Sequence, residues 1–392
     1  MNRESSDMDT FIPLSVPSLK GNELKYVTEV VTQEWVSTGG AMINRFEDDL
    51  ARYVGVETAV ACQSGTSGLH LALMLAGVGM NDEVIVPTLT FIAAVNPIKY
   101  VGAEPIFMDC DESLCMDPDK LEQFCREECF LDGDNLVNKR TKKHIKALIV
   151  VHVFGNMADM ERISQIARSY NLFLIEDATE ALGTYYTSGN FQGKFAGTIG
   201  DIGVYSFNGN KVITTGGGGM LVAKKPELAG KAKYLSTQAK DDDIYFIHNE
   251  VGYNYRMTNL QAALGVAQLE QLERFIEVKR INFEHYSQAI NEIEGLSMIP
   301  FKRNIRPNYW FYSMYVDGFA LSRDELINHL ASRRIQARPV WGLIHQQLPY
   351  RSCYSYYIEK SIDYQSKIIN IPCSSNLTEE EVCRVIKSLK DI

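Results

Sequence analysis

Short, continuous apolar runs recur through the first two thirds of the chain, and they constrain the fold more than any other feature of its 392 residues. KALIVVHVFG (146–155) and LFLIEDA (172–178) are the clearest of them. A strand with one face in water alternates apolar and polar residues, whereas these runs are apolar at nearly every position. We therefore expect a sheet that is covered on both faces.

Helical patterns separate the runs and predict what covers the sheet. The expected strands are 58–63, 83–87, 104–109, 146–155, 172–178, 201–207 and 219–225. The expected helices between them are 69–78, a segment from Phe91 to about Gly102, and 160–171. Strands that alternate with helices are typical of parallel βαβ units. The sequence therefore predicts an α/β domain in which helices sandwich a mostly parallel sheet.

The pattern changes at about residue 250. Residues 256–290 form one long helical pattern, in which we expect a bend, and WFYSMYVDGF (310–319) reads as a strand. A further helix is expected after Ser322, because acidic residues follow it in the first turn, and a final helix near Thr378. These shorter elements indicate a smaller α+β unit.

The two patterns suggest two domains. We divide the chain into a large α/β domain over residues 1–250 and a small C-terminal α+β domain over residues 251–392. Residues 111–145 interrupt the large domain with a charged and irregular stretch that includes CREECFLDGDNLVNKRTKKH. We expect this stretch to be a solvated surface excursion.

The composition limits which kinds of partner we expect the protein to bind. The chain carries 39 Lys and Arg against 49 Asp and Glu, a net charge of −10, so a nucleic acid would be repelled on average. No apolar run reaches the ~18–20 residues that span a bilayer, and the polar segment MNRESSDMDT is unlike a signal peptide. The eight cysteines are scattered without a C-x-x-C pair, which favours free thiols over a metal site. We expect a cytoplasmic protein with no metal, no membrane and no nucleic-acid partner.

The first candidate for chemistry is the segment SGTSG (64–68), which joins a strand ending at Cys62 to a helix. Free backbone N–H groups and the positive end of a helix dipole form an anion site, and small residues let a phosphate approach closely. The segment matches neither a Walker A sequence nor G-x-G-x-x-G. Taken alone, the segment is better explained as an ordinary Ser/Thr helix cap.

The second candidate is Asp177, at the carboxyl end of the strand 172–178. Open α/β sheets bind ligands at this end of their strands. A carboxylate buried there needs a partner, and a protonated heterocyclic nitrogen is one such partner. A backbone cap or an ion pair would satisfy it as well. Glu180, three residues further on, is placed to face the same pocket.

The third candidate is Lys211, which follows the strand 201–207 almost at once. Most lysines are surface charges. A lysine in a cleft at the end of a core strand, however, has its pKa lowered by burial and becomes a nucleophilic amine. Gly216–Gly219 come next and predict a tight turn, since glycine readily adopts positive φ.

The three candidates form parts of one device. They supply a phosphate cup, an anion for a ring nitrogen and an amine for an aldehyde, and pyridoxal phosphate needs all three. In this interpretation Asp177 keeps the ring nitrogen protonated, while Lys211 holds the cofactor and later carries the proton.

Seven segments in this order resemble the DegT/StrS family of sugar aminotransferases, which are fold-type-I pyridoxal phosphate enzymes that act on nucleotide-linked keto-sugars. The segments are SGTSGLHLAL, PTLTF, VHVFGN, IEDATEALG, GDIGVYSFNGNK, GGGGM and GYNYRMTNLQAALG. The resemblance covers nearly the whole chain, from about Ile12 onward. It implies a fold-type-I sheet domain with a smaller C-terminal α+β domain.

The resemblance also implies roles for single residues around the cofactor. Gly65 and Thr66 match the phosphate-binding pair, and Ser206 matches a serine that reaches the same phosphate. Phe91 matches the aromatic residue that stacks on the cofactor ring, and Asp177 matches the carboxylate on the ring nitrogen. Glu180 occupies a position near the cofactor O3′ or the substrate.

Further matches concern the partner subunit and the substrate. Asn254 matches an asparagine that reaches the phosphate of the neighbouring subunit, which implies a homodimer with shared active sites. Ser37, Thr38, Gly39 and His345 lie where relatives contact the sugar nucleotide.

The resemblance finally implies a reaction. Some relatives that dehydrate sugars have histidine in place of the lysine, so Lys211 favours transamination. Residues 111–145 and TQAKDDD (237–243) look like the subgroup that makes 4-amino sugars for legionaminic acid or bacillosamine. We therefore expect L-glutamate to donate its amino group to C4 of a UDP-linked 4-keto-6-deoxy-N-acetylhexosamine.

Three alternatives stay open. One is a sugar dehydratase on the same cofactor, and another is an aminotransferase for a GDP- or dTDP-linked 3- or 4-keto-sugar. A non-catalytic protein on this scaffold is the third, although it would need neither Lys211 nor Asp177. Asn208 stands where many relatives have histidine, and the sequence does not connect this difference to a substrate.

Overall fold

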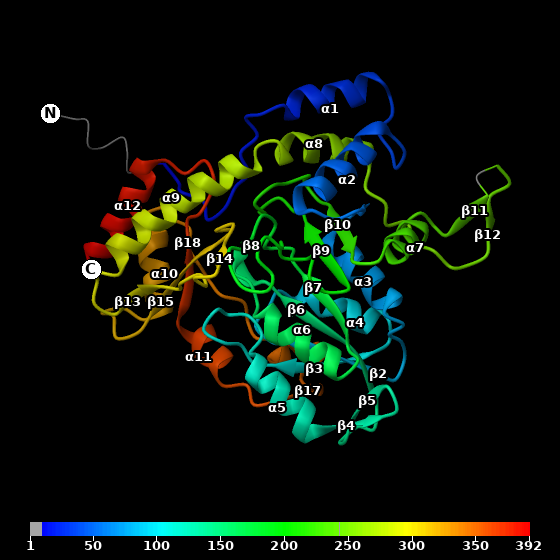
Figure 1. Cartoon of the computed structure of the whole chain (residues 1–392). Coiled ribbons are helices and arrows are strands. Elements are labelled where there is room, and N and C mark those ends of the chain that lie inside the picture. The colour runs from blue at the N-terminus through cyan, green and yellow to red at the C-terminus, as the bar shows by residue number, and fades with distance from the viewer. Residues whose placement is uncertain (1–9, 243) are drawn as a thin grey trace.

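The computed structural model describes residues 10–242 and 244–392 of the chain (Figure 1). All but Thr10 of the N-terminal segment MNRESSDMDT lies outside the described residues, and so does Asp243 at the end of 237–243. Helices of sufficient length and apolar character to span a bilayer are absent from the described ranges. All eight cysteines are free.

A ten-stranded sheet forms the centre of the molecule. Its strands are β1 (Ala59–Cys62), β2 (Asp82–Pro87), β3 (Glu104–Met108), β4 (Cys129–Asp132), β5 (Asn135–Asn138), β6 (His144–Val151), β7 (Phe173–Asp177), β9 (Ile202–Ser206), β10 (Gly219–Ala223) and β17 (Tyr354–Ser355). The main path is β1-β10-β9-β7-β6-β2-β3-β17, and the β4–β5 hairpin pairs with β6. The path from β9 to β17 is parallel, whereas β10 runs antiparallel to both of its neighbours, β1 and β9. The sheet is therefore mostly parallel, as the sequence predicts.

Helices cover both faces of this sheet (Figure 1). One face is packed by α3 (Gly65–Leu75), α4 (Asn96–Tyr100) and α7 (Pro226–Ser236). The other is packed by α2 (Ala41–Val54), α5 (Pro118–Glu128), α6 (Met160–Ser169) and α8 (Asn259–Leu269), with α1 (Glu23–Thr32) outside α8. In β2, Val84 and Val86 join one buried cluster and Ile85 joins the other. The continuous apolar runs are explained, because both faces of each strand are buried.

Two sequence expectations in this domain are wrong. The segment from Phe91 to Gly102 is not one helix but a 3₁₀ turn, η2 (Ile92–Ala94), followed by the separate α4. Pro97 lies in the first turn of α4, where the absence of its N–H costs no helical hydrogen bond. Because Pro97 cannot donate a backbone hydrogen bond to the preceding turn, η2 and α4 do not join into one helix.

The second wrong expectation is the surface excursion at 111–145. This stretch contains α5 and the β4–β5 hairpin, which extends the central sheet. Leu121, Phe124 and Cys125 are buried, at the i, i+3, i+4 spacing of an amphipathic helix. The many charges of the segment occupy the outer face and conceal this pattern.

The C-terminal part builds a second, antiparallel sheet. Its order is β13 (Leu296–Met298), β15 (Tyr312–Val316), β18 (Ile368–Ile371) and β16 (Arg338–Pro339). The expected bend in 256–290 falls between α8 and α9 (Leu272–Ile290). Ser322 and Thr378 each form a capping box, at the starts of α10 (Arg323–Ser332) and α12 (Glu379–Lys390).

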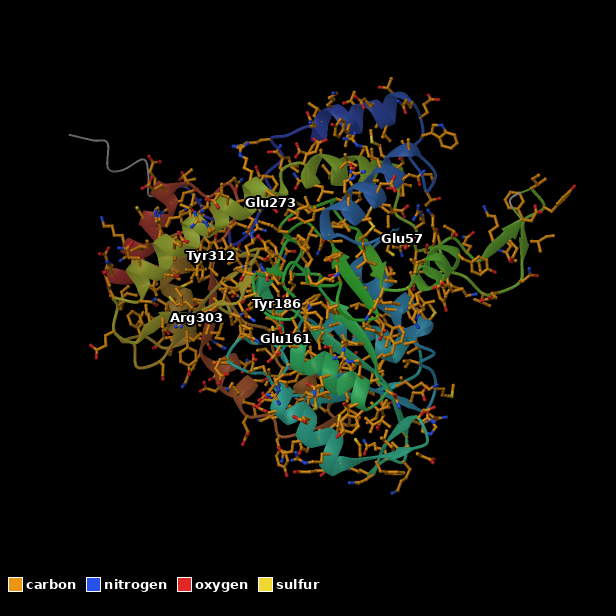
Figure 2. The ribbon with its side chains drawn as sticks, in the orientation of Figure 1. Glu57, Glu161, Tyr186, Glu273, Arg303 and Tyr312 are labelled. Atoms are coloured by element: carbon orange, nitrogen blue, oxygen red, sulfur yellow. The ribbon has the colours of Figure 1, made fainter. Side chains whose placement is uncertain are left out.

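The division at residue 250 stays a prediction, since two elements of the C-terminal part lie on the large sheet. The helix α8 packs against α1 and α2, and β17 pairs with β3. Tyr186 and Tyr312 are buried in the body of the molecule, whereas Glu57 and Arg303 are exposed (Figure 2). The remaining short elements are η3 (Val153–Gly155), β8 (Tyr185–Tyr186), β11 (Lys240–Asp242), β12 (Ile247–His248), β14 (Ile305–Arg306), η4 (Ile344–Gln346), η5 (Leu348–Tyr350) and α11 (Lys360–Lys367).

Candidate active site

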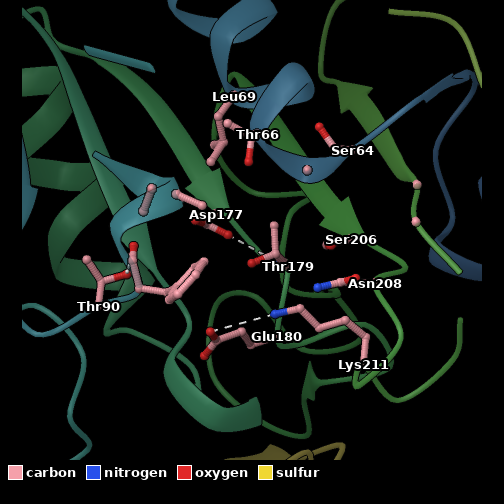
Figure 3. A pocket seen from close by; sticks show the side chains of 16 residues that line it. Ser64, Thr66, Leu69, Thr90, Asp177, Thr179, Glu180, Ser206, Asn208 and Lys211 are labelled. Atoms are coloured by element: carbon pink, nitrogen blue, oxygen red, sulfur yellow. Dashed lines mark hydrogen bonds and ion pairs between the residues drawn. The ribbon is translucent and has the colours of Figure 1, made fainter. Parts of the chain in front are cut away.

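A cavity of about 260 Å³ opens at the carboxyl ends of β2, β7 and β9 (Figure 3). Seven residues singled out in the sequence line it: Gly65, Thr66, Phe91, Asp177, Glu180, Ser206 and Lys211. Ser64, Thr90, Thr179, Asn208 and Gly217 are among the other lining residues. The ligand-binding end of an open α/β sheet thus carries the three candidates for chemistry together.

The N-terminus of α3 forms one wall of this cavity. Ser64 caps the helix, because its side chain accepts a hydrogen bond from the Ser67 N–H at 3.0 Å. A Cβ added to Gly65 would lie 2.9 Å from Thr179 Cγ2 and 3.1 Å from Ser206 Cβ. Only glycine fits this close approach without a shift of its neighbours. The Ser/Thr cap and the anion site proposed from the sequence are therefore compatible readings of one helix end.

Asp177 is the last residue of β7 and is almost fully buried. Its Oδ1 accepts a hydrogen bond from the Thr179 N–H at 3.1 Å. Among the described residues, no basic side chain lies within ion-pair distance of its carboxylate, and burial raises the pKa of Asp177. A protonated ring nitrogen in the cavity would supply the missing positive partner.

Lys211 and Glu180 face each other across the cavity (Figure 3). Lys211 Nζ lies 3.7 Å from Glu180 Oε1 and 4.0 Å from the centroid of the Trp310 ring. Glu180 Oε2 accepts a hydrogen bond from the Phe154 N–H at 2.9 Å, which fixes its orientation.

Burial dominates the titration of this pair. It raises the pKa of Glu180 to about 7. It lowers the pKa of Lys211, although the nearby Glu180 and Asp177 oppose the shift. A lysine with a lowered pKa has a larger fraction of free amine near neutral pH, which is the nucleophilic and basic form.

The loop between β9 and β10 holds Lys211 in place. Phe207 donates its N–H to the Gly218 carbonyl, and Thr215 donates its N–H to the Phe207 carbonyl, both at 2.9 Å. Gly216 has a positive φ of 78°, whereas a Cβ on Gly218 would lie 2.3 Å from Thr215 Oγ1. The predicted turn at Gly216–Gly219 therefore combines one left-handed residue with close packing.

A second cavity of about 390 Å³ continues from the first. It shares Phe91, Glu180, Asn208 and Lys211 with the first cavity and adds residues from the C-terminal part, including Trp310, Gln336, Arg338, Trp341 and Asn370. We call it the outer lobe. Apart from Lys211, Arg338 is the one basic residue among the described residues that line either cavity.

Sequence reasoning missed Trp310 and Arg338. Trp310 opens an apolar run and reads as core, yet its indole N–H donates to the Asn210 carbonyl at 2.7 Å and its ring contacts Lys211. Arg338 lies in a two-residue strand that has no periodic pattern. Both enter the site through tertiary folding, which joins residues about 100 or more positions apart.

Other sequence-predicted residues lie outside the two cavities. Ser37, Thr38 and Gly39 are exposed in the loop before α2. His345 forms a hydrogen bond with Thr88, at 2.6 Å between Nδ1 and Oγ1, and does not line either cavity. Asn254 is exposed. Their roles toward substrate and partner subunit stay predictions.

The residues of the inner cavity fit pyridoxal phosphate. A glycine whose Cβ would clash lies at the helix N-terminus, a buried carboxylate lacks a basic partner among the described residues, and an amine with a lowered pKa lines the same cavity. The exposed ring of Phe91 supplies an aromatic wall. These are the groups that a phosphate, a pyridinium nitrogen and an aldehyde require.

The fold and the site together define a pyridoxal-phosphate-dependent enzyme of fold type I. The chain matches the DegT/DnrJ/EryC1/StrS aminotransferase family over residues 17–390, and it belongs to that family. It is a nucleotide-sugar aminotransferase that uses pyridoxal phosphate, as the sequence motifs indicate.

Known proteins support this placement along the whole chain. GDP-perosamine synthase of Escherichia coli O157:H7 is 39% identical over 383 residues, covering 97% of this chain and 98% of the relative. EpsN of Bacillus subtilis strain 168, whose name states an aminotransferase but no sugar, is 37% identical over 383 residues, covering 96% and 95%. Among solved structures, the aminotransferase TlmJ from Streptoalloteichus hindustanus superimposes with a TM-score of 0.87 at 27% identity, covering 97% and 98%.

Proposed function

We propose that this enzyme transfers the amino group of L-glutamate to C4 of a GDP-linked 4-keto-6-deoxyhexose. The observation that carries the transfer is the grouping of Lys211, Glu180 and Asp177 in one buried cavity. The likeness to GDP-perosamine synthase supports the GDP-linked sugar. The sequence instead favoured a UDP-linked 4-keto-6-deoxy-N-acetylhexosamine, on the basis of 111–145 and 237–243. No described residue of these two segments lines either cavity, so they give no support for that choice.

Each residue of the inner cavity has a defined task toward the cofactor. When bound, pyridoxal phosphate supplies a ring that delocalises the electron pair left behind when a proton leaves the donor carbon. Asp177 would hold the ring nitrogen in its protonated form, which makes the ring a better electron sink. Gly65, Thr66 and Ser206 would bind the phosphate, and Phe91 would cover one face of the ring.

Lys211 carries the proton in both halves of the reaction. As a free amine, Lys211 Nζ removes the proton from Cα of glutamate, and in the second half it delivers a proton to C4 of the sugar. Glu180 lies beside it and stabilises its charged form between these events. The indole of Trp310 covers Nζ on another side and limits the access of water.

Arg338 is the residue that we propose to bind a carboxylate of glutamate. An amino-acid donor brings an anionic carboxylate into the site, and a guanidinium binds carboxylates through paired hydrogen bonds. In the described structure Arg338 makes no ion pair and its side chain reaches the outer lobe. It is therefore free to receive the donor.

We further propose that the active enzyme is a homodimer with shared sites. The β11–β12 hairpin projects from the body of the molecule (Figure 1) and exposes Ile244, Tyr245 and Phe246. Large apolar side chains at such a tip favour cover by a partner. Asn254, which follows the hairpin, is exposed outside the cavities of its own chain and would reach the phosphate in the partner's site.

Substitution of Lys211 by alanine tests the central assignment. We expect the variant to lose the visible absorbance of the bound cofactor and at least ~10²–10⁴-fold in turnover, because the amine that holds the cofactor and moves the proton is gone. The exposed Lys194 provides a control, since Lys194→Ala should leave both properties unchanged. Normal absorbance and turnover in Lys211→Ala would show that another residue does this work.

A substrate panel tests the sugar. The holoenzyme is incubated with glutamate and with GDP-, UDP- and dTDP-linked keto-sugars, and products are identified by mass. We expect the GDP-linked 4-keto-6-deoxyhexose to gain an amine fastest. Faster amination of a UDP-linked N-acetyl sugar would restore the original sequence expectation, and loss of water without gain of an amine would indicate a dehydratase.

A further inference from the structure

A third cavity lies at the opposite end of the central sheet from the active site. Its volume is about 540 Å³, and we call it the basal cavity. It is lined by the amino-terminal ends of β2 and β3, by residues 140, 141 and 143 before β6, and by residues 351–355, which lead into β17. The active site lies at the carboxyl ends of the same strands, so one strand length, roughly 15–25 Å, separates the two. They share no lining residue.

Three basic side chains converge on the basal cavity. Arg140, Lys143 and Arg351 line it, and within the described ranges none of them forms an ion pair. Arg140 lies over the Tyr354 ring, with 5.0 Å between its guanidinium carbon and the ring centroid. Arg351 donates its Nε–H to the Gln346 carbonyl at 2.9 Å, which leaves its terminal nitrogens free.

The two carboxylates in the cavity wall are already satisfied. Glu104 pairs with Lys99 at its outer side. Glu83 is buried and accepts a hydrogen bond from the Asn138 side chain at 2.9 Å, and burial raises its pKa. Three cationic side chains thus face two carboxylates. The cavity therefore carries an excess of positive charge on a protein whose net charge is −10.

We propose that the basal cavity binds a small ligand through a phosphate or diphosphate group. Two arginines offer planar forks that match phosphate oxygens, and Lys143 adds a point charge. Ser352 and Ser355 line the same cavity and offer uncharged hydroxyl donors. The volume accommodates a nucleoside diphosphate as well as free pyrophosphate.

A ligand in the basal cavity would connect the C-terminal part of the chain to the large sheet. Arg351 belongs to the segment that leads into β17, whereas Arg140 and Lys143 precede β6 of the large sheet. A phosphate held by both groups would tie the segment before β17 to the segment before β6, across the amino-terminal ends of β2 and β3. The segment 351–355 follows shortly after His345 and Arg338, so this tie also anchors the chain that contributes to the outer lobe.

The test measures binding of pyrophosphate to the holoenzyme by titration calorimetry at constant ionic strength. Pyridoxal phosphate then occupies the phosphate cup of the active site. We expect one saturable site per chain, and we expect the double variant Arg140→Gln/Arg351→Gln to bind at least tenfold more weakly. The matched control is Arg52→Gln/Arg126→Gln, which removes two exposed arginines elsewhere and should bind as the wild type does.

A second variant separates this site from the active site. Arg338→Gln should retain pyrophosphate binding, because Arg338 lies in the outer lobe. Loss of binding in Arg338→Gln, or unchanged binding in Arg140→Gln/Arg351→Gln, would overturn the proposal. Titration with GDP identifies the source of the phosphate group. If wild type binds GDP and Arg140→Gln/Arg351→Gln loses that binding, the ligand is a nucleotide. If Arg140→Gln/Arg351→Gln loses only the binding of pyrophosphate, the ligand is free diphosphate. Circular dichroism verifies that each variant is folded.

Discussion

At the scale of single residues, the site is defined by charges that the fold keeps out of water. Asp177 and Glu180 are buried carboxylates only three positions apart, and burial raises the pKa of each. Among the described residues that line their cavity, Lys211 is the one basic side chain. Its charge is shared between two acids, so a small change at one of the three shifts the protonation of the others.

Glu180 gives a prediction about pH. Its pKa rises from 4.5 in an ordinary environment to about 7 in the folded protein. The folded state therefore binds more protons than the unfolded state between those values, and this group's contribution to stability falls as the pH rises from about 4.5 to 7. Denaturant unfolding of the apoenzyme should show that wild type loses up to about 3 kcal/mol across this window relative to Glu180→Gln.

The same comparison has a clear contrary outcome. A difference between wild type and Glu180→Gln that stays constant from pH 4.5 to 7 would mean that Glu180 titrates normally. A difference that grows in favour of wild type would mean that the pair with Lys211 outweighs burial.

Arg338 gives a prediction about the donor. Arg338→Gln should raise KM for glutamate about 10–100-fold, since a charge-assisted hydrogen bond contributes about 1.5–3 kcal/mol. KM for the keto-sugar should change much less, because the keto-sugar has no carboxylate for Arg338 to bind. Steady-state kinetics with each substrate varied in turn provide the measurement, and an equal rise in both KM values would contradict the assignment.

At the scale of elements, the N-terminus of α3 packs closely against the end of β9. Gly65→Ala would place a Cβ 2.9 Å from Thr179 Cγ2 and 3.1 Å from Ser206 Cβ. We expect overpacking to lower the free energy of unfolding by about 1–3 kcal/mol and to weaken binding of pyridoxal phosphate. Chemical denaturation and a titration of the apoenzyme with the cofactor measure the two effects.

Gly230 provides the matched control. It lies in α7 with nothing within 4 Å of an added Cβ. Gly230→Ala should therefore stabilise the protein, by at most about 1 kcal/mol, and leave cofactor binding unchanged. If Gly65→Ala behaves like Gly230→Ala, the contact between α3 and β9 is looser than described.

At the scale of the whole molecule, the projecting hairpin predicts the dimer. Ile244→Asp/Tyr245→Asp should raise the dimer dissociation constant at least ~100-fold, because two apolar side chains of the proposed interface become charges. Sedimentation velocity should show monomers, and activity should fall with the dimer. Met80→Asp, at an equally exposed apolar residue away from the hairpin, is the control. A dimer that survives the double change would exclude the hairpin as its contact.

Much of this molecule is predictable from its sequence, and there are physical reasons why the remaining features are not. Residues such as Asp177 and Lys211 could be found because a polar group at the end of an apolar strand is unusual. Arg338 and Trp310 could not, since they reach the cavity only through long-range packing. The helix α5 was missed because its charges conceal a short apolar stripe.

The two residues of β17 have an effect out of proportion to their length. They cover the outer edge of β3, so the C-terminal part of the chain closes a sheet whose other strands all lie between residues 59 and 223. A protein truncated before Tyr354 would present an open strand edge, and open edges recruit other chains into aggregates. Engineers who wish to exchange the C-terminal part between relatives should therefore keep 351–355 with the sheet that it seals.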